Sequence, residues 1–422
     1  MNTNLELVAG LSGPQILEII TSAPGVKGRK VTTLNNKEKD LMELIQSIIS
    51  KEQLLKDPFF VLDLGEVASL LKRWTCNLPN VVPCYAIKCN PDPAILGALA
   101  ALGASFDCAS TAEIQTVMSL GVSPGRIIYA NPCKAESHIK YAASVGVNLT
   151  TFDCVEEIHK IQKHHPRSAL ILRIKTTDGG AIRRLDSKYG AVLGEVEPLL
   201  VAAQAAGLPV CGVSFHVGTG ITKVEVYSRA IAAAKRVFDM AARLGMPRMH
   251  LLDLGGGFSK GPLFDEAGKA VMSALHDYFG DELSDLTVIA EPGRYFAQSS
   301  FTLAANVIGK RARGEMREYW INDGVYGSMS SLQYGNSRVE PPLPLHSDNE
   351  RATEKKIYRS CVYGPTCDSQ DVVLKWHEMP ELEVNDWLVF GNMGAYTIAS
   401  ASNFNGFARS AIKTYLAYSN SN

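Results

Sequence analysis

Several residues with reactive side chains follow short apolar runs, the pattern of a site built at the ends of strands. Lys88 ends the run CYAIK, and a lysine whose stem is desolvated can form a Schiff base with a carbonyl group. For an isolated lysine, an amine that simply reaches water is the commoner arrangement. His216 in SFHVG also follows an apolar run, although a single histidine there is more often a hydrogen-bonded core residue.

Two glycine-containing turns offer groups that suit a phosphate. The motif LLDLGGGFS places Gly255–Gly257 after an apolar run, where backbone N–H groups can approach a phosphate closely, although a plain tight turn has the same sequence. The motif AEPGR places Glu291 and Arg294 on either side of Pro292-Gly293, and a guanidinium matches phosphate oxygens as a fork. A surface ion pair between these two side chains is the alternative.

Together, these residues match what pyridoxal 5′-phosphate requires of a protein. The cofactor needs a lysine amine, a flat ring to stack on its own ring, a cradle for its phosphate and a carboxylate. A carboxylate such as Glu291 keeps the pyridine nitrogen protonated, which strengthens the electron sink for carbanions at an amino-acid α-carbon. We therefore expect this cofactor. We expect no metal, because the nine cysteines form neither a CxxC pair nor a Cys/His cluster.

The elements that would position these residues follow a repeated strand and helix pattern. Continuous apolar runs, often followed by helical patterns, recur every 20 to 40 residues or so, which is typical of parallel βα units. The runs are FFVLDL, VPCYAIK, SFDCAS, RIIYAN, VNLTTFD, ALILRIK, VCGVSFHVG, MHLLDLGG and LTVIAEPG. They predict a (β/α)8 barrel over residues 59–300, with a doubly wound open sheet as the alternative. The barrel is favoured because the unusual residues fall at the carboxyl ends of the runs: Lys88, Asp107, Asn131, Arg173, His216, Gly255 to Gly257 and Glu291.

The segments that flank the barrel have other rhythms. The run LMELIQSIISKEQLL predicts an amphipathic helix that ends near Asp57-Pro58. From Phe301 onward, alternating apolar and polar residues predict antiparallel strands, and VEPPLPLHSDNERATEKK predicts an exposed loop. We therefore expect two domains, the barrel over residues 59–300 and a sheet domain formed by residues 1–58 and 301–422.

Composition excludes several classes of protein. The 422 residues include 42 Lys and Arg against 43 Asp and Glu, a formal net charge of −1, which argues against a nucleic-acid partner. No window approaches the roughly 18 apolar residues of a membrane span, so no membrane partner is expected. The first residues lack the basic start of a secretory signal. Scattered, unpaired cysteines favour a reduced, cytoplasmic protein.

The order of motifs closely resembles the eukaryotic, barrel-type ornithine decarboxylases, and the plant members most of all. The motifs that match in order are YAIKCNPDP, FDCAS, ANPCK, SFHVG, LDLGGGF, AEPGR, YWINDGVYGSM, GPTCDSQD and NMGAYT. This family also includes lysine, arginine and diaminopimelate decarboxylases. The resemblance implies an alanine-racemase-like barrel that binds pyridoxal phosphate, followed by a C-terminal β-sandwich or barrel-like domain.

The resemblance also implies roles for residues of the barrel. Lys88 would carry the cofactor, His216 would stack on its ring and Glu291 would pair with the pyridine nitrogen. The other residues that match cofactor-binding positions are Asp107, Glu113, Arg173, Thr219, Gly256, Gly257, Pro292, Gly293, Arg294 and Tyr396. Thr219 stands where the family usually has serine, a change that keeps the hydroxyl.

Two residues of GPTCDSQD match positions that act on the substrate. Cys367 would donate the proton that replaces the carboxylate, and Asp368 would bind the distal ammonium of the substrate. Seen alone, GPTCD is a turn beside a cysteine that need not react. In the family this pair completes the site of the partner subunit, so the resemblance implies a homodimer with shared sites.

The distal pocket departs from the family pattern. Tyr334-Gly335-Asn336 replaces a Tyr-Asp-His stretch whose aspartate helps to bind the distal ammonium. Losing one partner of a buried charge can cost about 2–5 kcal/mol. Three outcomes stay open: a diamino acid with lysine admitted beside ornithine, a less basic substrate, or lost activity.

These observations lead to one principal hypothesis for function. We expect decarboxylation of a basic L-amino acid, ornithine to putrescine or lysine to cadaverine, for polyamine or alkaloid biosynthesis. A non-catalytic homologue that binds a regulatory partner is one alternative, although the cofactor residues are all retained. An amino-acid racemase is another, and Glu291 argues against it because a racemase benefits from a weaker electron sink.

Overall fold

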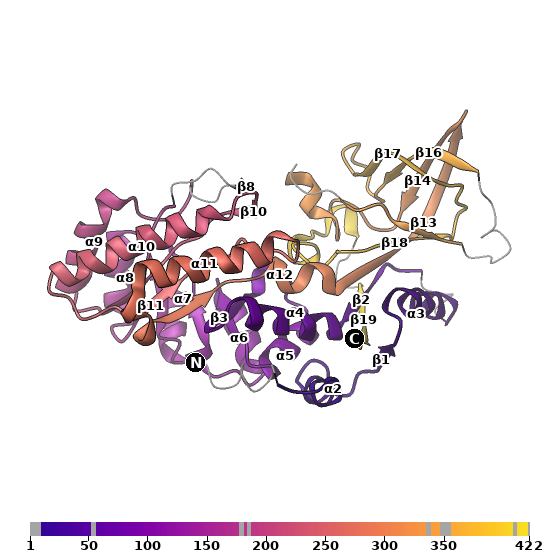
Figure 1. Cartoon of the computed structure of the whole chain (residues 1–422). Helices are drawn as coiled ribbons and strands as arrows, with labels where there is room; N and C mark the ends of the chain where they lie inside the picture. The colour runs from indigo at the N-terminus through magenta and orange to yellow at the C-terminus, as the bar shows by residue number, and fades with distance from the viewer. Residues whose placement is uncertain are drawn as a thin grey trace. The chain divides into compact units, whose positions relative to one another are not determined.

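The computed structural model describes residues 10–51, 56–176, 181–183, 187–334, 339–346, 356–407 and 412–420. The chain divides into two compact units, shown in Figure 1. The barrel unit comprises residues 1–26, 70–88 and 92–296, and the sheet unit comprises residues 27–69, 89–91 and 297–422. The two domain ranges expected from the sequence stay a prediction.

The barrel unit contains a closed barrel of eight parallel strands, as predicted. Around the barrel, the strands are β3 (Val81–Ala86), β4 (Ser105–Cys108), β5 (Ile127–Tyr129), β6 (Leu149–Phe152), β7 (Ala169–Arg173), β9 (Val210–Ser214), β11 (Leu251–Asp253) and β12 (Thr287–Ala290). Ladder pairing between β12 and β3 closes the ring. Nearly every strand residue is buried, which explains why the runs are apolar without alternation.

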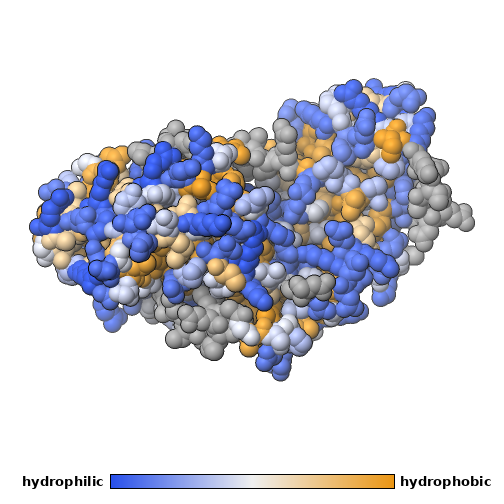
Figure 2. Space-filling view, viewed as in Figure 1, coloured by the Kyte–Doolittle hydropathy of each residue, from blue (hydrophilic) through white to orange (hydrophobic). Residues whose placement is uncertain are grey.

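Helices follow the strands, and most of them bury one face, whereas six consecutive residues of α5 (Pro93–Ala101) are buried. They include α4 (Leu64–Asn77), α5, α6 (Thr111–Ser119), α7 (Glu136–Ser144), α8 (Val155–His164), α9 (Leu193–Ala205), α10 (Glu225–Arg243) and α11 (Leu263–Phe279). The short helix α12 (Arg294–Ala297) follows β12, and α2 (Gly13–Ser22) precedes the barrel in sequence. Figure 2 shows hydrophilic side chains over much of the outer surface of α10 and α11. Side-chain caps start two of these helices, since Asp92 accepts a hydrogen bond from the Ala94 N–H and Ser110 from the Glu113 N–H.

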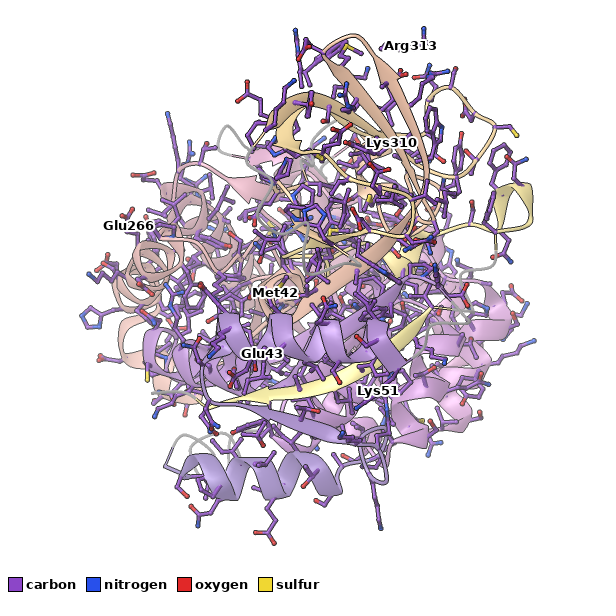
Figure 3. The ribbon with its side chains drawn as sticks, turned by 90° about the vertical axis from the view of Figure 1, so that its right-hand side faces the viewer. Met42, Glu43, Lys51, Glu266, Lys310 and Arg313 are labelled. Carbon is purple, nitrogen blue, oxygen red and sulfur yellow. The ribbon has the colours of Figure 1, made fainter. Side chains whose placement is uncertain are left out.

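The sheet unit is built on a nine-stranded sheet. The strands are β1 (Val31–Leu34), β2 (Phe59–Asp63), β13 (Phe301–Arg313), β14 (Met316–Ile321), β15 (Leu343–Leu345), β16 (Ile357–Tyr363), β17 (Val372–Pro380), β18 (Trp387–Phe390) and β19 (Lys413–Ser419). The predicted amphipathic helix is α3 (Lys37–Lys51), whose Ile45 and Ile48 are buried against the sheet. Figure 3 labels Met42, Glu43 and Lys51 on this helix, and Lys310 and Arg313 on the outer, exposed half of β13.

Three interpretations of the sequence are wrong in detail. The run FFVLDL is β2, which pairs with β13 and β19 in the sheet and is not a barrel strand. All five residues of β2 are buried, so its pattern cannot be told from that of a barrel strand. The sheet is mixed, because β1 with β19, β19 with β2, and β14 with β16 pair in parallel. The expected loop after Val339 contains β15, a short strand that pairs with β18, and residues 347–355 lie outside the described ranges.

Among the residues that the structure describes, no helix has both the length and the apolar character that a membrane crossing requires.

Candidate active site

The carboxyl ends of the barrel strands carry the predicted residues, as the sequence indicated. Lys88 lies in the short 3-10 helix η1 (Ile87–Cys89) that follows β3, and Asp107 lies near the end of β4. Arg173 is the last residue of β7, His216 follows β9 by two residues, and Glu291 directly follows β12. Side chains from five strands therefore meet at one end of the barrel, which is where barrels of this kind build their sites.

Lys88 is held by an ion pair with Asp107. The Lys88 Nζ contacts Oδ2 of Asp107, and the lysine side chain stays 43% exposed while the aspartate side chain is fully buried. The second oxygen of Asp107 is buried and accepts no hydrogen bond from any of the described residues. The amine is thus oriented by a buried carboxylate and still accessible to a ligand.

His216 presents a neutral ring. Burial, helped by the nearby positive charges of Arg173 and Lys88, lowers the pKa of His216 to about 3. The Gly218 N–H donates to its Nδ1 at 3.0 Å, so the proton of the neutral ring is on Nε2. A fixed, uncharged, flat ring is suited to stacking on an aromatic cofactor.

Glu291 lies beside a second acid, Asp253, which sequence reasoning missed. Asp253 ends β11 with no exposed surface, and its Oδ1 accepts the Gly255 N–H at 2.9 Å. Burial raises the pKa of Glu291 well above its usual range, and the charge of Asp253 adds to the effect. Burial also raises the pKa of Asp253 to about 7. The available signal was its position, an acid directly before the glycines of LLDLGGG.

The glycine turn after β11 has no room for side chains. Gly257 has φ +102°, and a Cβ there would lie 2.8 Å from the Gly218 carbonyl oxygen. A Cβ on Gly256 would lie 2.7 Å from Nε2 of His216. Backbone N–H groups in such a turn can approach a phosphate closely, as the sequence indicated.

Other predicted residues of the barrel unit lie in the segments that follow β9 and β12. Thr219 begins β10 (Thr219–Ile221), which pairs with β8 (Ala181–Arg183). The Pro292 carbonyl oxygen accepts the Ala86 N–H at 3.4 Å, which ties the Pro292-Gly293 turn to β3, and Arg294 begins α12. The residues present therefore fit pyridoxal phosphate, with an amine, a flat ring, a carboxyl group and a tight glycine turn on one end of the barrel.

Arg173 and Glu113, two further predicted residues, each contact a neighbouring group of the barrel unit. The guanidinium of Arg173 lies 5.4 Å from the ring centroid of Tyr189. The Ala109 N–H donates to the Glu113 carboxyl group at 2.5 Å, and burial raises the pKa of Glu113.

Cys367 and Asp368 lie in the sheet unit, in the turn between β16 and β17. Cys367 is exposed, and its N–H donates to Oδ1 of Asn405 at 3.0 Å. The Tyr326 hydroxyl donates to Asp368, and this hydrogen bond lowers the pKa of Asp368. The Tyr326 ring lies 4.4 Å from that of Phe404. Asp368 is therefore held ionised next to an aromatic pair.

The same segments line a cavity of about 200 Å³ within the sheet unit. Tyr326, Thr366 and Phe404 are among its lining residues. Tyr396, also in this unit, has φ +56°, and its N–H donates to the Cys89 carbonyl oxygen at 2.9 Å. Tyr334 ends the 3-10 helix η5 (Ser330–Tyr334), and Gly335-Asn336 lie outside the described residues.

Comparison with known proteins identifies the family. The sequence model described as pyridoxal-dependent decarboxylase, pyridoxal binding domain, matches residues 64–298. The chain belongs to this decarboxylase family. A curated relative from Nicotiana glauca, named a chloroplastic ornithine decarboxylase, is 56% identical over 395 residues, which are 92% of this chain and 90% of the relative.

Solved structures of decarboxylases have the same fold. The arginine decarboxylase of Paramecium bursaria Chlorella virus, solved with agmatine, is 36% identical with a TM-score of 0.83, and the match covers 89% of this chain and 99% of that one. The lysine/ornithine decarboxylase of Vibrio vulnificus, solved with cadaverine, is 29% identical with a TM-score of 0.80, and the match covers 91% and 99%. The chain is a decarboxylase of this family, and pyridoxal phosphate is its cofactor.

Among the described residues, no group of three or more His, Cys, Asp and Glu side chains is placed to bind a metal ion. In pyridoxal-phosphate decarboxylation the cofactor supplies the electron sink, so the reaction does not require a metal ion.

Proposed function

We propose that this decarboxylase acts on a basic L-amino acid, ornithine or lysine, and releases the corresponding diamine. The observation that carries the proposal is Asp368, an acid of the sheet unit whose pKa is lowered by a hydrogen bond from the Tyr326 hydroxyl. An ionised carboxylate is the group expected to bind a distal ammonium. The names of the three relatives above support a basic substrate, since they refer to ornithine, arginine and lysine.

The barrel residues would hold the cofactor. Pyridoxal phosphate, when bound, withdraws electrons from the α-carbon as carbon dioxide leaves. The Lys88 amine would bind its aldehyde, and Asp107, whose Oδ2 contacts Lys88 Nζ, would orient that amine. The neutral His216 ring would stack on the cofactor ring, and Glu291 would accept a hydrogen bond at the ring nitrogen.

The phosphate would be bound by four features of the chain. The Gly256-Gly257 turn would donate backbone N–H groups, Arg294 would donate from its guanidinium, and Tyr396 would donate its hydroxyl. Thr219 directly follows Gly218, whose carbonyl oxygen would lie 2.8 Å from a Cβ on Gly257, and its hydroxyl would donate to the same group.

The substrate end would come from the sheet unit. Cys367, exposed at the surface, would donate a proton to the α-carbon after decarboxylation. Asp368 would bind the distal ammonium. We infer a homodimer in which Cys367 and Asp368 of one subunit complete the site of the other, as the family resemblance implies.

Gly335 favours a substrate range that includes both ornithine and lysine. A carboxylate is missing where the family has one, so Asp368 would bind the distal ammonium alone and the pocket would be larger by a side chain. A longer side chain such as that of lysine needs this room. The cytoplasmic location expected from the sequence stays a prediction, and the Nicotiana glauca relative is named chloroplastic.

The experiment is a substrate panel with the purified, cofactor-loaded protein. Carbon dioxide release is measured with ornithine, lysine, arginine, diaminopimelate and neutral amino acids, for the wild type and for Gly335→Asp. We expect release from a diamino acid and a shift toward ornithine in the variant. Gly261→Ala, at an exposed glycine with open space around it, is the matched control. Absence of release from every basic amino acid would refute the proposal.

A further inference from the structure

Asn90 is a buried polar residue of the motif YAIKCNPDP to which the proposed function assigns no role. Only 1% of it is exposed, and its Nδ2 donates to the Gly394 carbonyl oxygen at 2.9 Å. The carbonyl oxygen of the preceding residue, Cys89, accepts the Tyr396 N–H, also at 2.9 Å. Two consecutive residues, which directly follow Lys88 in the chain, are therefore hydrogen-bonded to the loop that carries Tyr396.

The same loop packs against the end of α12. The Gly394 N–H donates to the Gln298 carbonyl oxygen at 3.2 Å, and a Cβ on Gly394 would lie 1.8 Å from the Ala297 carbonyl oxygen. Ala297 ends α12, a single-turn helix that begins at Arg294. The residues in contact here, with Cys89 and Asn90, all belong to the sheet unit. The loop is thus tied to two segments that each begin beside a residue proposed to bind the cofactor.

Tyr396 needs this support because its backbone lies in the left-handed region. Its φ of +56° is uncommon for a residue other than glycine, and such a conformation persists where the surrounding structure imposes it, often at ligand-binding sites. The Cys89 carbonyl oxygen fixes the Tyr396 N–H, and Asn90 fixes the Gly394 carbonyl group two residues earlier. Asn90 therefore helps to hold the turn that sets the direction of the Tyr396 side chain.

We propose that Asn90 is a positioning residue for the phosphate of the cofactor and acts through the Tyr396 backbone. The inference rests on the proposed function, which assigns the Tyr396 hydroxyl to the phosphate and the Lys88 amine to the aldehyde of the same molecule. Because Asn90 follows Lys88 by two residues, its bond to Gly394 sets the spacing between the Lys88 and Tyr396 backbones before the cofactor binds. Such preorganisation raises affinity, since less conformational freedom is lost on binding.

The inference predicts a loss of affinity that depends on the phosphate. In Asn90→Ala, the Gly394 carbonyl oxygen loses the Asn90 donor, and Tyr396 can relax toward a negative φ. The Kd for pyridoxal phosphate should rise about tenfold, an effect in the range expected when one buried hydrogen bond is lost. Pyridoxal has the same ring and aldehyde but no phosphate, so its Kd should not change.

The test is a double-mutant cycle with pyridoxal phosphate and pyridoxal as the probes. Both Kd values are measured by absorbance and fluorescence titration of the cofactor-free protein, for the wild type, Asn90→Ala, Tyr396→Phe and the double variant. Asn306→Ala is the matched control, because Asn306 is also buried in the sheet unit and its Nδ2 donates to the Asp386 carbonyl oxygen at 3.2 Å. Asn90→Ser, whose hydroxyl ends closer to the backbone than the asparagine amide, is a second variant, and thermal unfolding shows which variants fold.

We expect Asn90→Ala and Asn90→Ser to bind pyridoxal phosphate about tenfold more weakly, and Asn90→Ala to add nothing in the Tyr396→Phe background. The control should bind both probes as the wild type does. Four results would overturn the inference while the role of Tyr396 stands: equal losses for both probes, a wild-type Kd for pyridoxal phosphate, an equal effect in both backgrounds, or failure of both Asn90 variants to fold. Wild-type binding of pyridoxal phosphate by Tyr396→Phe would instead overturn the proposed role of Tyr396, and this inference with it.

Discussion

Gly256→Ala tests the placement of the His216 ring against the glycine turn. The added Cβ would lie 2.7 Å from Nε2 of His216 and 3.2 Å from the Glu291 carbonyl oxygen. An ordinary contact needs about 3.4 Å, so the ring must move by about 0.7 Å. The ring is also tied to the Gly218 N–H by a 3.0 Å hydrogen bond, so it cannot move freely.

The expected cost follows from this overlap. Forcing an extra methyl group into a packed site typically costs about 1–3 kcal/mol, which corresponds to a factor of about 5 to 150 in an equilibrium constant. Because the displaced ring is the one proposed to stack on the cofactor, we expect the Kd for pyridoxal phosphate to rise by such a factor. The assay is titration of the cofactor-free protein, with Gly261→Ala as the control because a Cβ there meets no atom within 4 Å. Equal affinity for Gly256→Ala and the wild type would refute the described packing of His216.

Two further predictions concern single side chains. Because the folded state lowers the pKa of His216 to about 3, its share of stability is present above the unfolded pKa of 6.5 and is lost as pH falls below it. Protonation of this group should therefore lower the free energy of unfolding of the cofactor-free protein by about 1.4 kcal/mol between about pH 7.5 and pH 5.5. In urea unfolding of His216→Phe, the decrease over the same pH range should be smaller by this amount. For Asp368→Asn, steady-state assays should give a KM for the diamino acid at least about tenfold higher, because the bond to the distal ammonium loses its charge. An unchanged KM would mean that Asp368 does not bind the substrate.

Local motifs predicted where several of the candidate site residues lie in the barrel. Lys88, His216 and Glu291 each follow an apolar run in the sequence, and parallel strands bring their carboxyl ends to one end of a barrel. Asp253 was not predicted, because an acid before glycines is also the sequence of an ordinary turn. It lies near Glu291 because β11 and β12 are neighbouring strands of the closed barrel, and that pairing is not visible in the local sequence.

The sheet unit was harder to predict from the sequence. β2 pairs with β13 and β19, far apart in sequence, and no local pattern encodes such pairings. Because all five residues of β2 are buried, its sequence is a continuous apolar run like that of a barrel strand. The hydrogen bond from Tyr326 to Asp368 joins segments 42 residues apart, so the lowered pKa of Asp368 could not be predicted from local sequence.

The central claim is that this chain removes carbon dioxide from a basic L-amino acid and replaces it with a proton. Mass spectrometry of the products formed from L-ornithine and L-lysine in deuterium oxide tests it most directly. We predict putrescine or cadaverine with a single carbon-bound deuterium, formed in the same amount as carbon dioxide. Recovery of the amino acid with deuterium at its α-carbon and no diamine would contradict the claim, because that result describes proton exchange without decarboxylation.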